Sequence, residues 1–208
     1  MPDGAASFAA APEAGASGGA RIGPNAILQL IAPMQSALGR DATERILARA
    51  GLFHLPNGSA MIPESDAARL HRQLRADEPV LAPLVLAEAG HGTALYIMGH
   101  RIPRAARALL RAMPAPLAAR ALSRAIARHA WTFVGSGRFR AVTPWLFEIE
   151  DNAIVAGERA RRCSCDWHAA VFAGLYSTLV ARDCHCVETA CAARGDPLCR
   201  FEVSRGQA

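Results

Sequence analysis

The sequence predicts an α+β fold, in which N-terminal helices pack on a small antiparallel sheet made of two hairpins around a helix. Apolar residues recur at helical spacing from Pro24 to about Ala130. Near Phe133 the apolar period changes to the alternation that is typical of strands. Turn residues then divide the C-terminal part into two pairs of strands, with one further helical segment between the pairs.

The composition indicates a folded protein without a nucleic-acid partner. A chain of 208 residues can bury a core without disulfides and indicates one domain with appendages. Hydrophobic residues make up 51% and charged residues 20%, which excludes wholesale disorder. The net charge of +5 comes from arginines that have acidic residues interspersed among them along most of the chain, and aromatic residues are only 6%. A nucleic-acid binder would cluster basic residues with stacking aromatics, so we expect none here.

The N-terminus and the most apolar stretch give no targeting or membrane signal. Residues 1–20 are rich in Gly, Ala and Pro without periodicity, which predicts a disordered tail rather than a signal peptide. Residues 80–98 are interrupted by Glu88 and two glycines, and so fall short of a membrane span. We expect a cytoplasmic protein, where six cysteines indicate metal or redox chemistry more often than disulfides.

Residues 21–77 are expected to form an N-terminal helical region. An apolar stripe follows Pro24 and predicts the first helix. Asp41 and Glu44 have the spacing of a capping box, which predicts the start of a second helix. Pro63 is expected to open a third helix.

The second part of the chain begins at residue 78 with a longer predicted helix that extends to about residue 98. Gly90 and Gly92 in this helix permit close approach of another backbone or mark its end. Two helices are expected after Pro103 and Pro114, because arginines repeat there every three or four residues opposite apolar positions.

Strand patterns follow over residues 138–142 and 145–150, which we expect to form a hairpin. Residues 165–181 are helical by their apolar spacing. A second hairpin is predicted from residues 184–191 and 198–203, which are joined by a turn at Gly195-Asp196-Pro197.

This arrangement brings four potential metal ligands toward one corner. In the predicted fold Cys165 begins a helix, Glu188 and Cys191 end one strand, and Cys199 begins the partner strand. Three thiolates and a carboxylate match a tetrahedral Zn²⁺ site. Glu188 and Cys191 differ by three positions and would point to opposite faces of a regular strand, so the site requires a bulge or strand end near residues 189–190.

Spacing alone leaves alternatives open. The thiols could be scattered core residues, because free Cys packs as a small hydrophobe. Cys163, Cys184 and Cys186 are further candidates, and Cys184-His185-Cys186 could bind a metal by itself. The cysteine runs fit no usual iron–sulfur spacing.

At these residues a family resemblance becomes specific. The arrangement Cys-x₂₂-Glu-x₂-Cys-x₇-Cys resembles the vinyl-4-reductase-type small-molecule-binding domain. The resemblance covers residues 78–204 and is strongest over 150–204. It implies a ligand pocket between helices and sheet, in a fold similar to that of trafficking subunits that bury an acyl chain. It also implies a structural Zn²⁺ with the ligands Cys165, Glu188, Cys191 and Cys199.

Within that family, a chain of this length with N-terminal helices most resembles the small members that serve bacteriochlorophyll biosynthesis, first assigned as 4-vinyl reductases. The resemblance implies a tetrapyrrole-binding protein that carries a porphyrin or Mg-porphyrin to the magnesium-chelation and methylation steps. The tetrapyrrole would be a ligand rather than a cofactor, and magnesium chelatase and a methyltransferase would be the partners. A peripheral position at the photosynthetic membrane and a homodimer are compatible with this interpretation.

The alternative is a 4-vinyl (8-vinyl) reductase of divinyl chlorophyllide, which would need a hydride source. Gly135-Ser136-Gly137 lacks a third glycine and precedes a strand, so it is no dinucleotide fingerprint. A zinc with four protein ligands is structural rather than catalytic. The residues therefore favour binding over catalysis, and no catalytic residue is predicted. A second alternative is a sensor or scaffold that acts through a protein partner.

A pocket for a flat, apolar ligand with propionates should combine aromatic side chains with arginine donors. Four aromatic residues flank the change from helix to strand, two arginines near the end of the long helix could meet a carboxylate, and one histidine could coordinate Mg²⁺. The ordinary alternatives are core packing, a solvated helix face and a hydrogen-bonded histidine. The predicted ligand residues are His100, Arg101, Arg104, Trp131, Phe133, Trp145 and Phe147.

Overall fold

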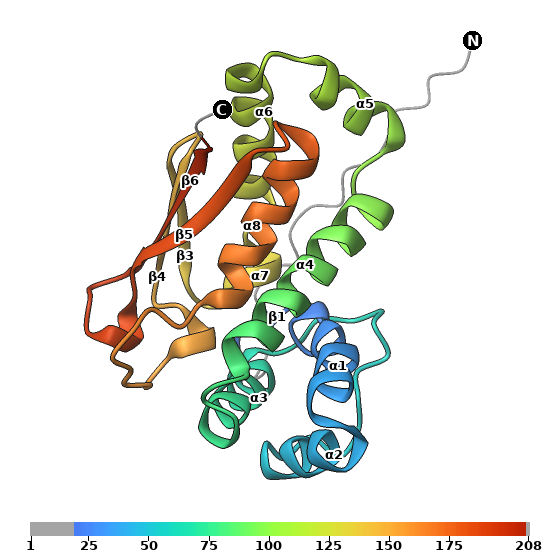
Figure 1. The fold of residues 1–208 in the computed structure, drawn as a ribbon, viewed down its shortest axis with the longest axis vertical. Helices are drawn as coiled ribbons and strands as arrows, with labels where there is room; N and C mark the ends of the chain where they lie inside the picture. The colour runs from blue at the N-terminus through green and yellow to red at the C-terminus, as the bar shows by residue number, and fades with distance from the viewer. Residues whose placement is uncertain (1–18, 207–208) are drawn as a thin grey trace.

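The structure is a computed structural model that describes residues 19–206, and it has the predicted α+β fold (Figure 1). Most of the tail predicted over residues 1–20 lies outside the described residues. The division of the chain at residue 78 stays a prediction, because helices on both sides of it pack into one core.

The N-terminal region forms three helices at one end of the molecule (Figure 1). A two-stranded sheet lies beside them and fixes the start of α3. The elements are β1 (Arg21–Ile22), α1 (Asn25–Leu38), α2 (Arg40–Arg49), β2 (Ile62–Pro63) and α3 (Glu64–Asp77).

The predicted capping box at Asp41 and Glu44 is wrong. Gly39 has a φ of 83° and ends α1, so α2 begins one residue later without a side-chain cap. Asp41 therefore lies inside the first turn of α2, where its carboxylate still faces the positive end of the helix dipole.

Two long helices, α4 (Ala82–His100) and α8 (Asp166–Leu179), pack against each other through the centre of the molecule (Figure 1). Gly90 and Gly174 make this contact close. A Cβ atom at Gly90 would lie 2.4 Å from the carbonyl oxygen of Trp167, and one at Gly174 would lie 2.8 Å from the Cβ of Ala94. The predicted close approach at Gly90 is confirmed.

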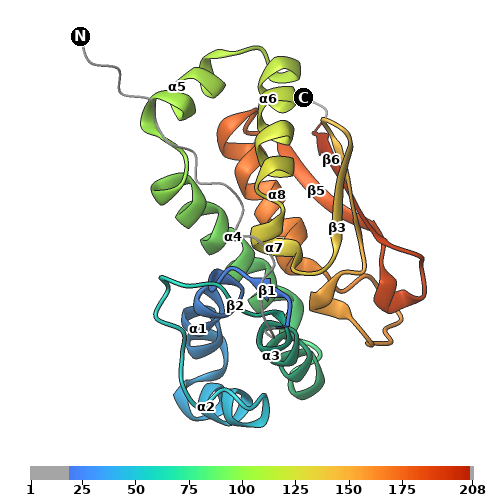
Figure 2. The ribbon, with the colours of Figure 1, turned by 180° about the vertical axis from the view of Figure 1, so that it is seen from behind.

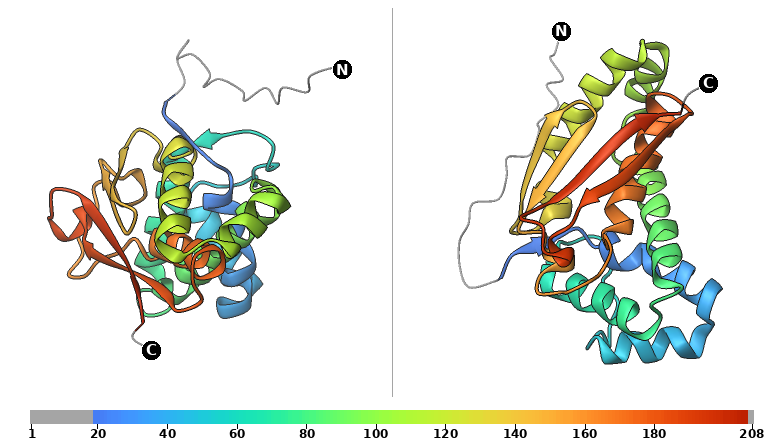
Figure 3. Two further views of the ribbon diagram at one scale, coloured as in Figure 1. Left: turned by 90° about the horizontal axis from the view of Figure 1, so that it is seen from above. Right: turned by 60° about the vertical axis from the view of Figure 1, so that its left-hand side comes forward.

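The two predicted hairpins join into one four-stranded antiparallel sheet with the order β3-β4-β6-β5. β4 pairs with β6, with Phe147 opposite Phe201. Helices α8 and α6 cover one face of the sheet, and the other face is open in the described part of the chain (Figure 3). The strands are β3 (Arg138–Thr143), β4 (Leu146–Glu150), β5 (Cys184–Ala190) and β6 (Cys199–Arg205).

The remaining helices α5 (Arg104–Ala112), α6 (Ala115–Arg128) and the short α7 (Trp131–Val134) connect α4 to the sheet (Figure 2). α5 and the start of α6 lie at the end of the molecule far from α1–α3. Within residues 19–206, no helix has both the length and the apolar character that crossing a membrane requires.

Candidate metal centre

The four predicted metal ligands meet at one corner of the sheet. Cys165 directly precedes α8, Glu188 lies near the end of β5, Cys191 follows β5, and Cys199 is the first residue of β6. Their potential ligand atoms all lie within 4.8 Å of one another. Because the residues come from three elements, the fold itself assembles the group.

A β-bulge turns Glu188 and Cys191 toward the same side. Glu188 is opposite Phe201 and Ala190 is opposite Arg200, so Thr189 is an extra residue in β5. The predicted bulge at residues 189–190 is therefore confirmed, and it reverses the alternation that would have separated the two side chains.

The turn after β5 holds Cys191 in place. The carboxylate of Asp196 accepts a hydrogen bond from the backbone N–H of Cys191 at 2.8 Å. The backbone N–H groups of Arg194 and Asp196 donate to the carbonyl of Cys191 at 2.9 and 3.2 Å. Gly195, at a φ of 98°, supplies the left-handed residue that this turn needs.

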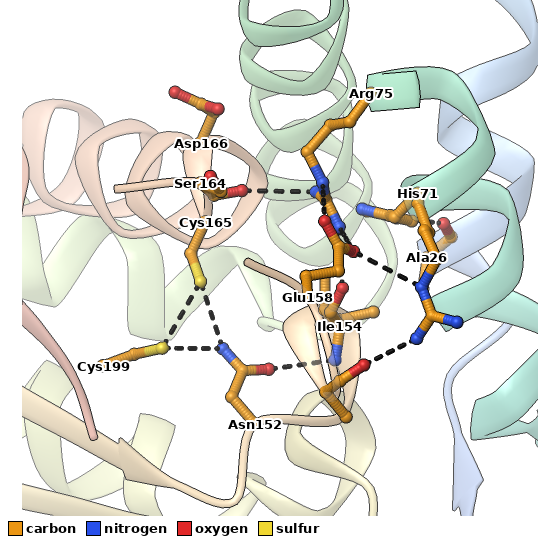
Figure 4. A network of polar contacts seen from close by, with 12 residues as sticks. Ala26, His71, Arg75, Asn152, Ile154, Glu158, Ser164, Cys165, Asp166 and Cys199 are labelled. Atoms are coloured by element: carbon orange, nitrogen blue, oxygen red, sulfur yellow. Dashed lines mark hydrogen bonds and ion pairs between the residues drawn. The ribbon is translucent and has the colours of Figure 1, made fainter. Parts of the chain in front are cut away.

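Nitrogen donors face the sulfur atoms (Figure 4). The side-chain amide of Asn152 donates to the Sγ atoms of Cys165 and Cys199 at 3.3 and 3.5 Å. The backbone N–H of Ala192 donates to the Sγ of Cys199 at 3.5 Å. The two sulfurs are 3.5 Å apart, and both cysteines are free. Donors of this kind stabilise negative charge on sulfur.

The electrostatics of the group call for a cation. Burial raises the pKa of the Glu188 carboxyl to about 8 and raises the pKa of the Cys165 thiol well above its usual value. Hydrogen bonding from the Cys165 thiol instead lowers the pKa of Cys191. Among the described residues no arginine forms an ion pair with Glu188. Buried ionised groups require a partner of opposite charge.

Glu188 also has an unused oxygen. Its Oε2 accepts a hydrogen bond from the backbone N–H of Cys165 at 2.7 Å, whereas its buried Oε1 has no partner. Sulfur atoms about 2.3 Å from a tetrahedral Zn²⁺ would be about 3.8 Å apart, which is compatible with the observed spacing. The donor set therefore fits zinc with four protein ligands.

Arg75 on α3 supports the corner from behind, and sequence reasoning missed it (Figure 4). Its guanidinium donates to the carboxylate of Glu158, and to the carbonyl oxygens of Ile154 and Ser164 at 2.8 and 3.2 Å. The side chains of Arg75 and Glu158 are only 11% and 12% exposed. This clamp fastens α3 to the segment that connects Asn152 with Cys165.

The other cysteines and two aromatic neighbours lie outside the ligand group. Cys163, Cys184 and Cys186 are not members of the cluster. Trp167 and His168 lie in the first turn of α8, but their ring nitrogens contact the hydroxyl of Thr93 and the carbonyl of Phe133.

Three of the predicted tetrapyrrole contacts belong to one aromatic cluster inside the fold. Phe133 and Phe147 both pack on Phe172 of α8, with ring centroids 6.0 and 4.9 Å apart. Trp145 packs on Tyr176, with a centroid distance of 5.6 Å. Phe147 is completely buried, so in this structure the cluster fills the space between α8 and the sheet.

The other predicted contacts lie on the surface and do not converge with this cluster. His100, Arg101, Arg104 and Trp131 are exposed, and the ring of His100 stacks on Tyr96 with a centroid distance of 4.4 Å. None of the seven predicted residues lines the pocket of about 680 Å³ between α3 and the 151–158 segment. None lines the pocket of about 540 Å³ at the end of α8 either.

The fold and the cysteine corner define a chain with a vinyl-4-reductase-type domain, and the model of that domain family matches residues 145–205. A bacteriochlorophyll synthase 23 kDa chain from Cereibacter sphaeroides is 51% identical over 185 residues, which cover 88% of this chain and 90% of the relative. A protein of the same description from Rhodobacter capsulatus is 45% identical over 183 residues, which cover 87% and 85% of the two chains. The chain belongs to the family of the bacteriochlorophyll synthase 23 kDa chains, and the resemblance inferred from the Cys and Glu spacing is confirmed.

Solved structures with a similar fold include H-NOX proteins. A mutant of the Fe(II) unliganded H-NOX protein from K. algicida has a TM-score of 0.58 at 9% identity, covering 89% of this chain and 97% of the other. A structure solved to probe heme distortion in the H-NOX family has a TM-score of 0.52 at 9% identity, covering 89% and 96%. At this identity the likeness shows the fold alone.

Proposed function

We propose that this chain binds a tetrapyrrole intermediate of bacteriochlorophyll biosynthesis and presents it to the enzymes of magnesium chelation and methylation. Its family membership supports a role in that pathway. The observation that carries binding rather than catalysis is the closed donor set, because four protein ligands leave no open position for a substrate. The shared fold of a protein described for its heme, itself a tetrapyrrole, is compatible with this role.

The proposal includes a structural zinc on Cys165, Glu188, Cys191 and Cys199. Zinc, when bound, would supply folding free energy by linking the start of α8 to both strands of the second hairpin. The chain's own residues prepare the site, since Asn152 and the N–H of Ala192 already point at the sulfurs. Its test is the metal content of full-length protein purified without chelator. About one zinc per chain is expected, and less than half would contradict the assignment.

A pair of cysteine variants separates ligand from bystander. Cys199→Ser should lose the zinc, because Cys199 is buried in the ligand group, whereas Cys163→Ser should keep it, because Cys163 lies outside that group. If both variants retain one zinc per chain, Cys199 is not a ligand.

The carrier role is tested by titration with protoporphyrin and Mg-protoporphyrin. Quenching of Trp145 and Trp167, which report on the interior of the fold, should give a Kd in the micromolar range, about −8 kcal/mol. Affinity of this order would solubilise a pigment and still release it to the next enzyme. Absence of binding together with absence of any stimulation of magnesium chelation would refute the role.

The same preparation distinguishes the carrier from a vinyl reductase. A binding protein should not consume NADPH or reduced ferredoxin in the presence of a divinyl substrate. Conversion of a vinyl to an ethyl group by the purified chain would replace the carrier proposal with the enzymatic one.

A further inference from the structure

The positive charge of this chain is concentrated in one stretch. Between Glu88 and Glu148 the sequence contains no Asp or Glu. Helices α5 and α6 lie inside this stretch, so neither helix carries an acidic residue. Their six arginines are Arg104, Arg107, Arg111, Arg120, Arg124 and Arg128.

None of these six side chains forms an ion pair with any residue in the range 19–206. By contrast, Arg75 on α3 and Arg200 on the sheet both pair with carboxylates. Arg120, Arg124 and Arg128 recur every four residues, so they share one face of α6, and all three are exposed. The chain itself therefore offers no counter-charge to this face.

Large apolar side chains are exposed on the same segment. Leu109 on α5 is 63% exposed, Leu117 on α6 is 50% exposed, and Trp131, three residues beyond Arg128, is 47% exposed. No residue of α5 is buried. The segment thus combines unpaired arginines with apolar groups that the fold does not cover.

This surface is remote from the cysteine corner. The Nε of Arg111 donates to the carbonyl of Thr178 near the C-terminal end of α8 at 3.1 Å, whereas Cys165 precedes the N-terminal end of that helix. Figures 1 and 2 show α5 at the end of the molecule opposite α1–α3. The two features can therefore be tested separately.

We propose that the exposed face of α5 and α6, together with Trp131, docks on the anionic surface of a lipid bilayer. Helices that lie in a membrane interface present arginines to anionic headgroups and insert leucine and tryptophan at the boundary of the acyl chains. An acidic protein would satisfy the arginines alone, whereas a bilayer also takes up the exposed leucines and the indole. The inference does not depend on the proposed cargo.

The test is co-sedimentation of the full chain with two kinds of vesicle, phosphatidylcholine alone and an equal mixture of phosphatidylcholine and phosphatidylglycerol. Binding is expected only to the mixed vesicles, and it should weaken as salt rises above about 0.1 M, where charges are screened beyond about 10 Å. The emission of Trp131 should shift to shorter wavelength on binding, and Trp131→Phe identifies its share of the signal.

A matched pair of triple variants tests the surface itself. R120Q/R124Q/R128Q should weaken binding on the order of 100-fold, because each basic residue near an anionic surface contributes about five-fold. The control R45Q/R159Q/R161Q removes the same charge from exposed arginines that also have no ion pair, and it should bind like the parent. Equal loss in both triples would overturn the proposal, as would a failure of the parent to bind mixed vesicles at low salt. Capture of an acidic protein without vesicle binding would overturn it as well.

Discussion

The Arg75 clamp gives the sharpest prediction about the support of the cysteine corner. Arg75→Met keeps the apolar stem of the side chain and removes the guanidinium, which leaves the Glu158 carboxylate 12% exposed without its close partner. The carbonyl oxygens of Ile154 and Ser164 lose a donor in the same step. Segment 152–164 should therefore loosen from α3.

The size of the effect follows from the burial of the pair. Removing one partner of a buried ion pair costs about 3–5 kcal/mol, because the other charge stays buried and uncompensated. The Nε of Arg72 lies 4.0 Å from the same carboxylate and offsets part of this cost. We therefore expect the lower end, about 3 kcal/mol, or a fall in Tm of about 6–12 °C for a chain of this size.

Urea unfolding followed by far-UV circular dichroism measures the loss, and two further variants make it specific. Arg72→Met should cost less than about 1 kcal/mol, because its guanidinium is half exposed. The double variant R75M/E158L should be more stable than Arg75→Met, because no buried charge remains unpaired. If Arg75→Met costs no more than Arg72→Met, or if the two changes at Arg75 and Glu158 simply add, the clamp does not act as a buried ion pair.

Three further predictions concern single buried positions. Burial and the nearby Arg75 charge lower the pKa of His71 to about 3, so the unfolded chain takes up a proton first and stability falls below about pH 6.5, by up to about 1.4 kcal/mol per pH unit. His71→Gln retains a donor to the Ala26 carbonyl, and chemical denaturation at several pH values should show a flatter slope; an unchanged slope would exclude His71 as its source. Gly90→Ala should destabilise strongly in thermal unfolding, because the new Cβ would meet the backbone of Trp167 at 2.4 Å, whereas a neutral result would mean that α4 and α8 can separate freely. Asn152→Leu should weaken zinc binding about 10–100-fold in a chelator competition while the fold persists, and unchanged affinity would show that its amide does not matter to the metal.

The fold could be predicted because it is written in local periods. The strand alternation around Phe147 and Phe201 and the helical spacing after Pro24 each appear within a short window of sequence. The bulge at Thr189 could be predicted because two ligands three positions apart cannot share a face of a regular strand. The pairing of β4 with β6 is a long-range choice that no local period contains.

The support of the site could not be predicted in the same way. Arg75 and Asn152 are single polar residues whose partners are backbone carbonyls, sulfurs and a carboxylate far along the chain, so no spacing identifies them. The aromatic residues misled for a different reason. Phe147 is on the inner face of β4 by alternation, which is the pattern of a core residue, and the structure packs it against Phe172.

The separation of the cysteine corner from the arginine surface leads to a last prediction. Helix α8 has 14 residues, so its ends are about 20 Å apart at a rise of about 1.5 Å per residue. This distance is twice the screening length of about 10 Å at 0.1 M salt, so a change of charge at Cys165 scarcely alters the field at Arg120 or Arg124. Mild chelation should therefore increase hydrogen exchange in the turn between β5 and β6 and leave binding to anionic vesicles unchanged within about two-fold at that salt. A parallel loss of vesicle binding, in protein that retains its helical circular dichroism, would mean that α8 transmits a structural change from one end to the other.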